Sequence, residues 1–182
     1  MLKVSDNPPI IWPEEKSISQ FEGQWWVAHT KSRNEKVLAH ELIKHNTPYF
    51  LPMRWKTLHY KKRKLKSLLP LFSGYLFFCG KENNRLAALR TNRIANLIKV
   101  DNQQKLVQEL LQIEKAIKTG ASLQPHKYLQ KGQRCQVTAG PMANLVGIVI
   151  ETKGTARLVL QIDMLGQAAS VEIDIDTIEL ID

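Results

Sequence analysis

The chain has 182 residues, of which 43% are apolar, enough to pack one medium domain or two small ones. It carries 26 lysines and arginines against 17 aspartates and glutamates, a formal net charge of +9. Two cysteines are too few for a disulfide scaffold, and no apolar run approaches the roughly 18 residues of a membrane span. The first twenty residues do not resemble a signal peptide. We therefore expect a cytoplasmic protein with no membrane partner.

The basic excess is concentrated in the first part of the chain. Residues 1–125 hold 21 basic and 10 acidic residues, a net +11, whereas residues 126–182 hold 5 and 7, a net −2. A dispersed excess would only favour solubility. The segment 54–66, however, contains seven basic residues and no acidic one. This pattern favours a surface that faces a polyanion such as nucleic acid.

The chain is predicted to begin with a loosely ordered tail over residues 1–20, which are polar and carry three prolines. Aromatic and β-branched residues over 24–29 then predict a buried strand. Ser32 and Glu35 have the spacing of a capping box, so the first helix is expected to start there and to end before Pro48.

Strands and one more helix are expected in the remainder of the first part. Residues 49–51 and 74–78 predict strands on either side of a basic hairpin or loop over 54–66, and residues 97–100 are a further candidate strand. Apolar residues recur at helical spacing from 106 to 117 and predict a helix that ends at Gly120.

After Gly120 the pattern changes to short strands without a helix. Strand signals are found at 133–138, 146–151, 158–162 and 170–176. In the last of these, Val171, Ile173 and Ile175 alternate with acidic residues, which predicts one buried and one solvated face. About fifty residues in five short strands would close most economically as a small barrel.

The two halves, in this order, resemble the NusG family of transcription elongation factors. The first half resembles the NGN domain through Trp25-Trp26-Val27-Ala28-His29-Thr30 and through residues 69–77, which are similar to an L-F-P-G-Y-[LV]-F run with Ser73 in place of the proline. The second half resembles the KOW domain over residues 132–137, 140–147 and 166–173. The resemblance covers residues 22–182.

The resemblance implies an α+β fold in two domains. An NGN domain over residues 21–118 would have an antiparallel sheet flanked by helices. After a linker over 119–128, a small SH3-like all-β KOW barrel would occupy residues 129–182. The resemblance further implies a monomer without a cofactor.

Such an NGN domain is expected to bind bacterial RNA polymerase, hold its clamp closed, reduce pausing and promote antitermination. The residues that match the surface facing the clamp helices are His29, Phe72, Tyr75 and Phe77, and those on the side of the gate loop are Asn84, Arg85 and Ala87. For Phe72 and Phe77, ordinary core packing is an equal alternative. Tyr75, with an apolar ring and a hydroxyl, suits an interface better.

Specialised members of the family also contact the non-template DNA of the transcription bubble. Lys31, Arg33 and Asn34 occupy the matching place at the start of the first helix, and a solvated first turn is the alternative. A second candidate nucleic-acid surface lies in the basic segment, at Lys61, Lys62, Arg63 and Lys64.

KOW domains of the family recruit the Rho terminator or a small-subunit ribosomal protein. The candidate contact residues here are Met142, Leu145, Met164, Leu165 and Gln167. Met142 and Leu145 stand where aromatic residues are usual, so anchors that dominate interface energetics are missing. This departure disfavours Rho binding and favours a specialised antitermination paralogue of the RfaH type.

No enzyme or metal site is expected. His40 and His45 are five residues apart on a predicted helix and do not share a face. Cys79 follows an apolar strand, where a cysteine is usually a small buried hydrophobe. The alternative in another class is a KOW-type RNA-binding or ribosome-associated protein without polymerase contact, which would leave the pattern between residues 25 and 77 unexplained.

Overall fold

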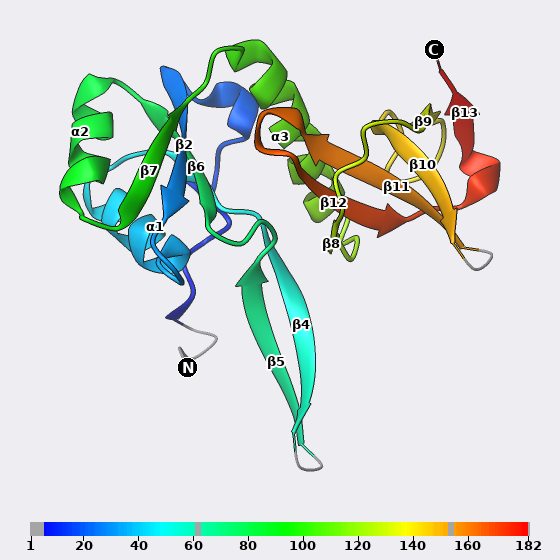
Figure 1. Ribbon diagram of the computed structural model, residues 1–182, viewed down its shortest axis with the longest axis horizontal. Helices are drawn as coiled ribbons and strands as arrows, with labels where there is room; N and C mark the ends of the chain where they lie inside the picture. The colour runs from blue at the N-terminus through cyan, green and yellow to red at the C-terminus, as the bar shows by residue number, and fades with distance from the viewer. Residues whose placement is uncertain (1–5, 61–62, 153–154, 182) are drawn as a thin grey trace. The chain divides into compact units, whose positions relative to one another are not determined.

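The computed structural model describes residues 6–60, 63–152 and 155–181 (Figure 1). Contacts divide the chain into two units, Met1–Gln103 and Gln104–Asp182, which we call the N-unit and the C-unit. The N-unit combines strands and helices, and the C-unit is a sheet with one long helix. The predicted fold class, an α+β part followed by an all-β sheet, is confirmed.

An antiparallel sheet forms the centre of the N-unit, and its described strands number five, in the order β1-β3-β6-β2-β7. The strands are β1 (Ile11–Trp12), β2 (Gln24–Thr30), β3 (Tyr49–Phe50), β6 (Tyr75–Gly80) and β7 (Ile94–Lys99). The helices of the unit are α1 (Glu35–Lys44) and α2 (Glu82–Arg90), with a 3₁₀ turn η2 (Ile18–Gln20). A separate hairpin is made by β4 (Met53–Tyr60) and β5 (Arg63–Pro70).

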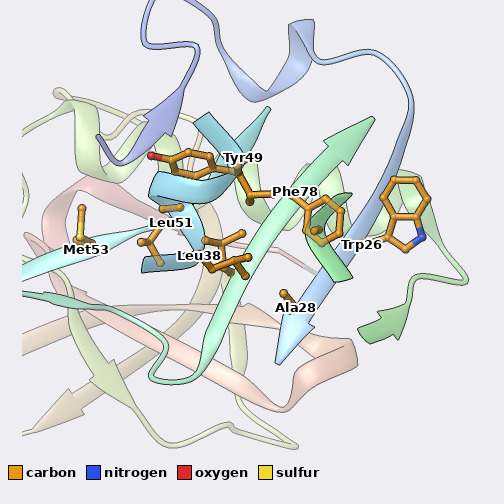
Figure 2. Close-up of a cluster of buried hydrophobic side chains, with 11 residues drawn as sticks. Trp26, Ala28, Leu38, Tyr49, Leu51, Met53 and Phe78 are labelled. Carbon is orange, nitrogen blue, oxygen red and sulfur yellow. The ribbon is translucent and has the colours of Figure 1, made fainter. Parts of the chain in front are cut away.

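The core of the N-unit lies between this sheet and its helices. Strand β2 pairs with β6 so that Trp26 is opposite Phe78 and Ala28 is opposite Leu76. Side chains alternate across a strand, so these four residues share one face. They pack there with residues of α1, β3, β4 and α2 (Figure 2), namely Leu38, Ala39, Leu42, Tyr49, Leu51, Met53 and Ala88. Because α1 is amphipathic, its apolar side covers this face.

Residues 6–20 differ from the loosely ordered tail that we expected. Strand β1 pairs with β3, with Ile11 opposite Phe50 and Trp12 opposite Tyr49. The Tyr49 hydroxyl donates a hydrogen bond to the Pro9 carbonyl at 2.9 Å, and Ile18 is buried. The prolines here are compatible with an edge strand, where an N–H can be missing without loss of a ladder bond.

The first helix starts differently from the predicted capping box. Asn34 is the N-cap residue and its side chain does not cap the helix; instead its amide donates to the Ser32 carbonyl at 2.9 Å. Glu35 is buried, and its carboxylate accepts a hydrogen bond from the backbone N–H of Gly74 at 2.6 Å. Glu35 therefore joins the start of α1 to the loop before β6, a contact between residues 39 positions apart.

Helix α2 was not predicted from the sequence. Ala88 is its buried residue, so the helix has no apolar stripe that a periodicity argument could detect. Its first turn is closed by Asn84, whose side-chain oxygen accepts from the Lys81 N–H at 2.9 Å and whose amide donates to the Thr47 hydroxyl at 2.9 Å. Asn84 thus attaches the helix to the end of α1.

The C-unit contains a sheet whose described strands number six, in the order β13-β9-β10-β11-β12-β8. The strands are β8 (Gln124–His126), β9 (Gln133–Val137), β10 (Val146–Thr152), β11 (Thr155–Ile162), β12 (Gln167–Glu172) and β13 (Ile178–Leu180). Two 3₁₀ turns, η3 (Asp163–Leu165) and η4 (Ile175–Thr177), lie on either side of β12. Helix α3 (Gln103–Lys118) begins at the last residue of the N-unit and otherwise belongs to the C-unit.

Two details of the C-unit differ from the sequence expectations. Strand β8 lies in the expected linker and pairs with β12, with Ala169 opposite Pro125. The predicted strand over 170–176 ends at Glu172, and Ile175 is 53% exposed on a 3₁₀ turn. Asp174 stops the alternation because its carboxylate accepts from the Asp176 N–H at 3.1 Å, a local bond that competes with strand pairing.

We predict that Glu35→Ala lowers the free energy of unfolding of the N-unit by about 1–3 kcal/mol, because it leaves the Gly74 N–H without its acceptor. Glu41→Ala, on the exposed side of the same helix, is the control and should change the stability little. Urea unfolding followed by tryptophan fluorescence reports on this unit, since all four tryptophans precede residue 104. Equal effects of the two substitutions would contradict the role given to Glu35.

Candidate functional site

A second, aromatic face of the N-unit sheet lies opposite the face that packs on α1. The alternation of β2 and β6 places Trp25, Val27 and His29 on it, together with Tyr75 and Phe77. At one end, Trp25 stacks on Phe21 with ring centroids 5.7 Å apart. At the other end the strands present His29 and Tyr75. The solvent exposure of the side chains therefore increases along the face, from buried aromatic residues at one end to a partly exposed pair at the other.

His29 and Tyr75 form that pair. They are directly opposite in the β2–β6 register, and their rings stack with centroids 5.1 Å apart and an interplanar angle of 27°. His29 is exposed and Tyr75 is half-buried. Gly74 has φ +85°, and a Cβ there would lie 3.4 Å from the His29 ring, so a larger residue would be strained and would crowd the imidazole.

Phe72 and Phe77, the other two predicted clamp-facing residues, are buried. They are 2% and 0% exposed and pack edge to face, with ring centroids 6.4 Å apart. Phe50 lies against Phe77 at 6.5 Å. The structure thus brings the four predicted clamp-facing residues onto one face and leaves His29 and Tyr75 as the members that a partner can reach.

The residues predicted to contact DNA lie beside this pair, in the loop between β2 and α1. Lys31 and Arg33 are exposed, and Arg33 has φ +58°, an uncommon conformation for a residue of this type. The Lys31 ammonium donates to the Asn92 side chain at 2.7 Å, and the Lys31 N–H donates to the Arg93 carbonyl at 2.9 Å. Two loops distant in sequence therefore form one basic edge.

Arg93 is a member of this edge that the sequence reasoning missed. Its guanidinium donates to the Asn34 side chain at 3.3 Å, and its own side chain is exposed. No local motif marks Arg93, because it joins the edge only through the pairing of β7 with β2. Its nearness to Lys31 could be found only from the tertiary structure.

The candidate gate-side residues lie on α2. Asn84 makes the two hydrogen bonds that fix the start of the helix. Arg85 forms a 2.5 Å ion pair with Glu82 within the same helix, and Ala87 is half-buried. Asn84 therefore has a structural role, and the polar surface of α2 includes Glu82, Asn83 and Arg90 beside the half-buried Arg85.

The basic segment forms the β4–β5 hairpin. Lys61 and Lys62 lie outside the described residues. Arg63 opens β5 opposite Tyr60, and Lys64 is exposed opposite His59. The prediction of a hairpin over this segment is confirmed, and the strands extend it to Met53 at one end and Pro70 at the other.

Within the C-unit, α3 contacts the loops that carry the candidate KOW partner residues. Three side chains on one side of the helix make these contacts. The Glu109 carboxylate accepts from the Asp163 N–H at 3.4 Å, the Gln112 side chain accepts from the Val146 N–H at 3.0 Å, and the Lys115 ammonium donates to the Ala143 carbonyl. Their spacing of three residues places them along one helix face.

The candidate partner residues of these loops differ in exposure. Leu145 is fully buried and belongs to the core of the C-unit. Met164 is 39% exposed on η3, and Leu165 and Gln167 are half-buried. Met142 lines a hollow of about 340 Å³ with Arg157 and Glu172 among its walls. Leu145 therefore belongs to the core of the C-unit, whereas Met142 and Met164 are at least partly accessible to solvent.

Charged groups at the α3 contact shift each other's proton affinity. Burial, and secondarily the charge of Asp163, raises the pKa of Glu109 to about 7 from its ordinary 4.5. The hydrogen-bonded Lys105 ammonium, 2.5 Å from Asp163, holds the pKa of Asp163 below its usual 3.8. The Tyr128 hydroxyl also donates to Asp163, at 3.1 Å.

The described residues include no cluster of metal ligands, and both cysteines are buried. Within residues 6–60, 63–152 and 155–181, no group of three His, Cys, Asp or Glu side chains is placed to hold a metal ion. Cys79 is fully buried, as predicted, and burial raises the pKa of its thiol to about 11. Burial also raises the pKa of Cys135. In the same ranges, no helix has the length and apolar character to cross a membrane.

Comparisons with known proteins agree with the fold. A family model described as NusG, transcription termination factor nusG, matches residues 23–116. A structure of NusG from Thermotoga maritima, solved in a study of its domain interaction, is similar with a TM-score of 0.53 and 15% identity. The match covers 88% of this chain and 98% of that one. No protein in a search of curated sequences matches the chain.

The matched region includes strands β2, β3, β6 and β7 of the N-unit sheet, the His29–Tyr75 pair and most of α3. Since the family model matches more than half of the chain, the protein belongs to the NusG family. Members of this family are transcription factors that bind RNA polymerase, and they are not enzymes.

The raised pKa of Glu109 predicts a pH-dependent contact between α3 and the C-unit sheet. The folded chain binds this proton more tightly than the unfolded chain, so the contribution of Glu109 to stability falls as the pH rises from about 5 to about 8. Asp163 stays ionised in this range, and Lys105 and Tyr128, whose pKa values are both raised above their ordinary ones, keep their protons.

Glu109→Gln keeps an acceptor oxygen but cannot ionise. We therefore expect the Val146 and Asp163 N–H groups to exchange more slowly in the variant than in the parent at pH 8, and equally at pH 5. Hydrogen exchange compared at the same pH cancels the intrinsic pH dependence of exchange. A ratio of rates that is the same at both pH values would contradict the assigned pKa.

Proposed function

We propose that this protein is a transcription elongation factor that binds bacterial RNA polymerase through the N-unit, reduces pausing and promotes antitermination. The observation that carries the proposal is the stacked His29–Tyr75 pair at the end of the aromatic face. Membership of the NusG family supports polymerase as the partner. The finer assignment, that this pair meets the clamp helices, is part of the proposal.

The chemistry of the pair suits a protein interface. Each ring has an apolar face and a polar atom, which is the character of residues that dominate binding energy at the centre of interfaces. Both residues are held by the β2–β6 pairing and Phe77 of the same strand as Tyr75 is buried, so little backbone freedom is lost on binding. A binder of this kind can favour a closed clamp only through its differential affinity for that state. In this proposal, the residues of α2 face the gate loop of the polymerase.

A second contact is proposed with the non-template DNA of the bubble. Lys31, Arg33 and Arg93 supply positive charge for phosphates, and Asn34 and Asn92 supply hydrogen-bonding edges for bases. The uncommon φ of Arg33 supports a functional constraint at this position, since strain of this kind is concentrated at functional sites. This edge would add template preference to a mainly protein-borne attachment.

The C-unit is proposed to recruit a protein partner, as a KOW domain. Met164 is exposed and Met142 is half-buried in the two loops that α3 contacts. Methionines adapt to varied surfaces but are weaker anchors than aromatic residues. This favours a small-subunit ribosomal protein over Rho as the partner. It also favours a specialised paralogue of the RfaH type over the general factor. We further propose that the protein acts as a monomer.

The competing function is a KOW-type RNA-binding or ribosome-associated protein. It would use the basic surfaces but would give no role to the aromatic face. Retention by core polymerase separates the two, because the competing protein would not be retained in the absence of RNA.

We expect Tyr75→Ala to weaken retention by core RNA polymerase by about 30-fold or more, the loss associated with a central interface residue. Tyr128→Ala, an exposed tyrosine of the C-unit, is the matched control and should be retained like the parent chain. The measurement is a binding titration with nuclease-treated core polymerase. Equal binding of the Tyr75 variant and the parent would contradict the clamp assignment.

We further expect Lys31→Ala combined with Arg33→Ala to reduce antipausing on some templates while polymerase binding survives, because the basic edge reads DNA beside the protein contact. Lys127→Ala with Lys131→Ala removes the same charge from exposed positions of the C-unit and serves as the control. Single-round transcription on templates that differ only in the non-template strand provides the measurement. A uniform loss on every template would argue against base contacts at this edge.

A further inference from the structure

The β4–β5 hairpin is an arm with a fixed root. At the root, Met53 is 5% exposed in the N-unit core and Leu68 packs against the same cluster. The Lys36 ammonium of α1 donates to the Leu68 carbonyl at 2.5 Å, and burial lowers the pKa of Lys36. The Leu71 N–H donates to the Pro52 carbonyl at 2.8 Å and closes the base of the ribbon. The direction of the arm is therefore set by the core.

Beyond the root, the ribbon leaves the sheet. Figure 1 shows β4 and β5 extending away from the rest of the N-unit, and among described strands they pair only with each other. Its side chains become exposed along the way: Trp55, Lys56 and Thr57 on β4, and Lys64 and Lys66 on β5. A two-stranded ribbon of this kind is marginal by itself, so its exposed sequence is not explained by packing.

The register places an exposed tryptophan among lysines. Thr57 is opposite Lys66, and Trp55 is opposite Leu68, so the alternation puts Trp55, Lys66 and Lys64 on one face of the ribbon. Trp55 and Lys66 are diagonal neighbours across the strands, a separation of about 7–8 Å between Cα atoms. Trp55 is 50% exposed, whereas Trp25 and Trp26 are at most 5% exposed.

The charge of the arm selects the class of partner. Residues 53–70 contain seven lysines and arginines and no aspartate or glutamate. The core of a protein–protein interface is poor in charged residues, and lysine in particular is depleted there. A backbone of phosphates is the partner that such a surface complements.

The tryptophan selects the form of nucleic acid. In a duplex the base faces are covered by stacking, and lysines alone would suffice to hold the phosphates. Single strands expose their bases, which stack on aromatic side chains while basic residues follow the backbone. We propose that the β4–β5 hairpin is a single-stranded nucleic-acid binding arm, in which Trp55 stacks on a base and Lys64 and Lys66, on the same face of the ribbon, bind the flanking phosphates.

This inference deepens the proposed function. It rests on that function only for the origin of the bound single strand, which in a transcription complex would be the displaced DNA or the transcript. Binding itself requires no polymerase. The test therefore uses the full chain and labelled oligonucleotides, oligo(dT), oligo(rU) and a blunt DNA duplex, with anisotropy and tryptophan fluorescence measured over a range of salt concentrations. Failure of polymerase retention would leave these results unaffected.

We expect the single strands to bind more tightly than the duplex and to quench tryptophan fluorescence. Trp55→Leu should weaken binding to single strands by about tenfold and remove most of the quenching, since one stacked base is lost. Trp55→Phe keeps a stacking surface and should retain most of the affinity. Stronger binding to oligo(dT) or to oligo(rU) identifies the strand as DNA or RNA.

The lysines are tested by the salt dependence of binding. Lys64→Gln and Lys66→Gln together should lower the slope of log K against log salt by about 1.4, because two phosphate contacts each contribute about 0.7 on single strands. Lys16→Gln with Lys81→Gln removes the same charge from exposed positions off the arm and should leave the slope close to that of the parent.

Three results would overturn the proposal. One is a duplex bound as tightly as the single strands with no effect of Trp55→Leu, which would make the arm a duplex-phosphate contact. Another is the absence of binding to any oligonucleotide. The third is unchanged oligonucleotide binding by the arm variants together with lost retention on polymerase, which would make the arm a protein contact. Urea unfolding of each variant shows that the N-unit core is intact.

Discussion

The register between β2 and β6 is the constraint on which the rest of the N-unit depends. It places Trp26, Ala28, Leu76 and Phe78 against α1 and their neighbours on the opposite face. A slip of one residue would exchange the two faces of one strand and would separate the core residues from the α1 side chains that they pack against. The same register sets His29 opposite Tyr75. The candidate interface is therefore a consequence of how the core is packed.

Loops fixed to this sheet carry the remaining functional candidates. Glu35 connects the start of α1 to the loop that precedes Tyr75, so the basic loop and the aromatic pair are held by one buried carboxylate. Lys36, the next residue, holds the root of the hairpin through Leu68. Adjacent residues of α1 thus position two surfaces that differ in chemistry, one aromatic and one strongly basic. The first turn of α1 therefore both packs against the core and positions the two surfaces.

Sequence reasoning recovered what local patterns encode. Alternation and aromatic content located β2 and β6, helical spacing located α3, and the charge run located the hairpin. The predicted capping box at the start of α1 was wrong, because the Glu35 carboxylate accepts a hydrogen bond from the N–H of Gly74, 39 residues away. Helix α2 has no apolar stripe, and β1 and β8 depend on pairing with distant strands. Interactions that are long in sequence separation leave no local signal.

Some residues of the candidate site could likewise be predicted from the sequence, and others could be found only from the structure. The four aromatic-face residues could be selected from a motif, but which of them are exposed depends on tertiary packing, which buries Phe72 and Phe77. Arg93 and Trp55 were missed, since one joins its neighbours through strand pairing and the other is identified by its exposure. The acidic C-unit and the basic N-unit still account for the net charge of +9, and the hairpin carries much of the basic excess.

The central claim is that the His29–Tyr75 end of the aromatic face contacts RNA polymerase. Site-specific photocrosslinking tests it most directly, with a photoreactive benzoylphenylalanine in place of Tyr75 and, separately, in place of Tyr128 as the reference. The account predicts a crosslink from position 75 to the clamp helices of the polymerase, and none from position 128. Crosslinks from position 75 to nucleic acid alone, or no crosslink in a complex that still forms, would contradict it.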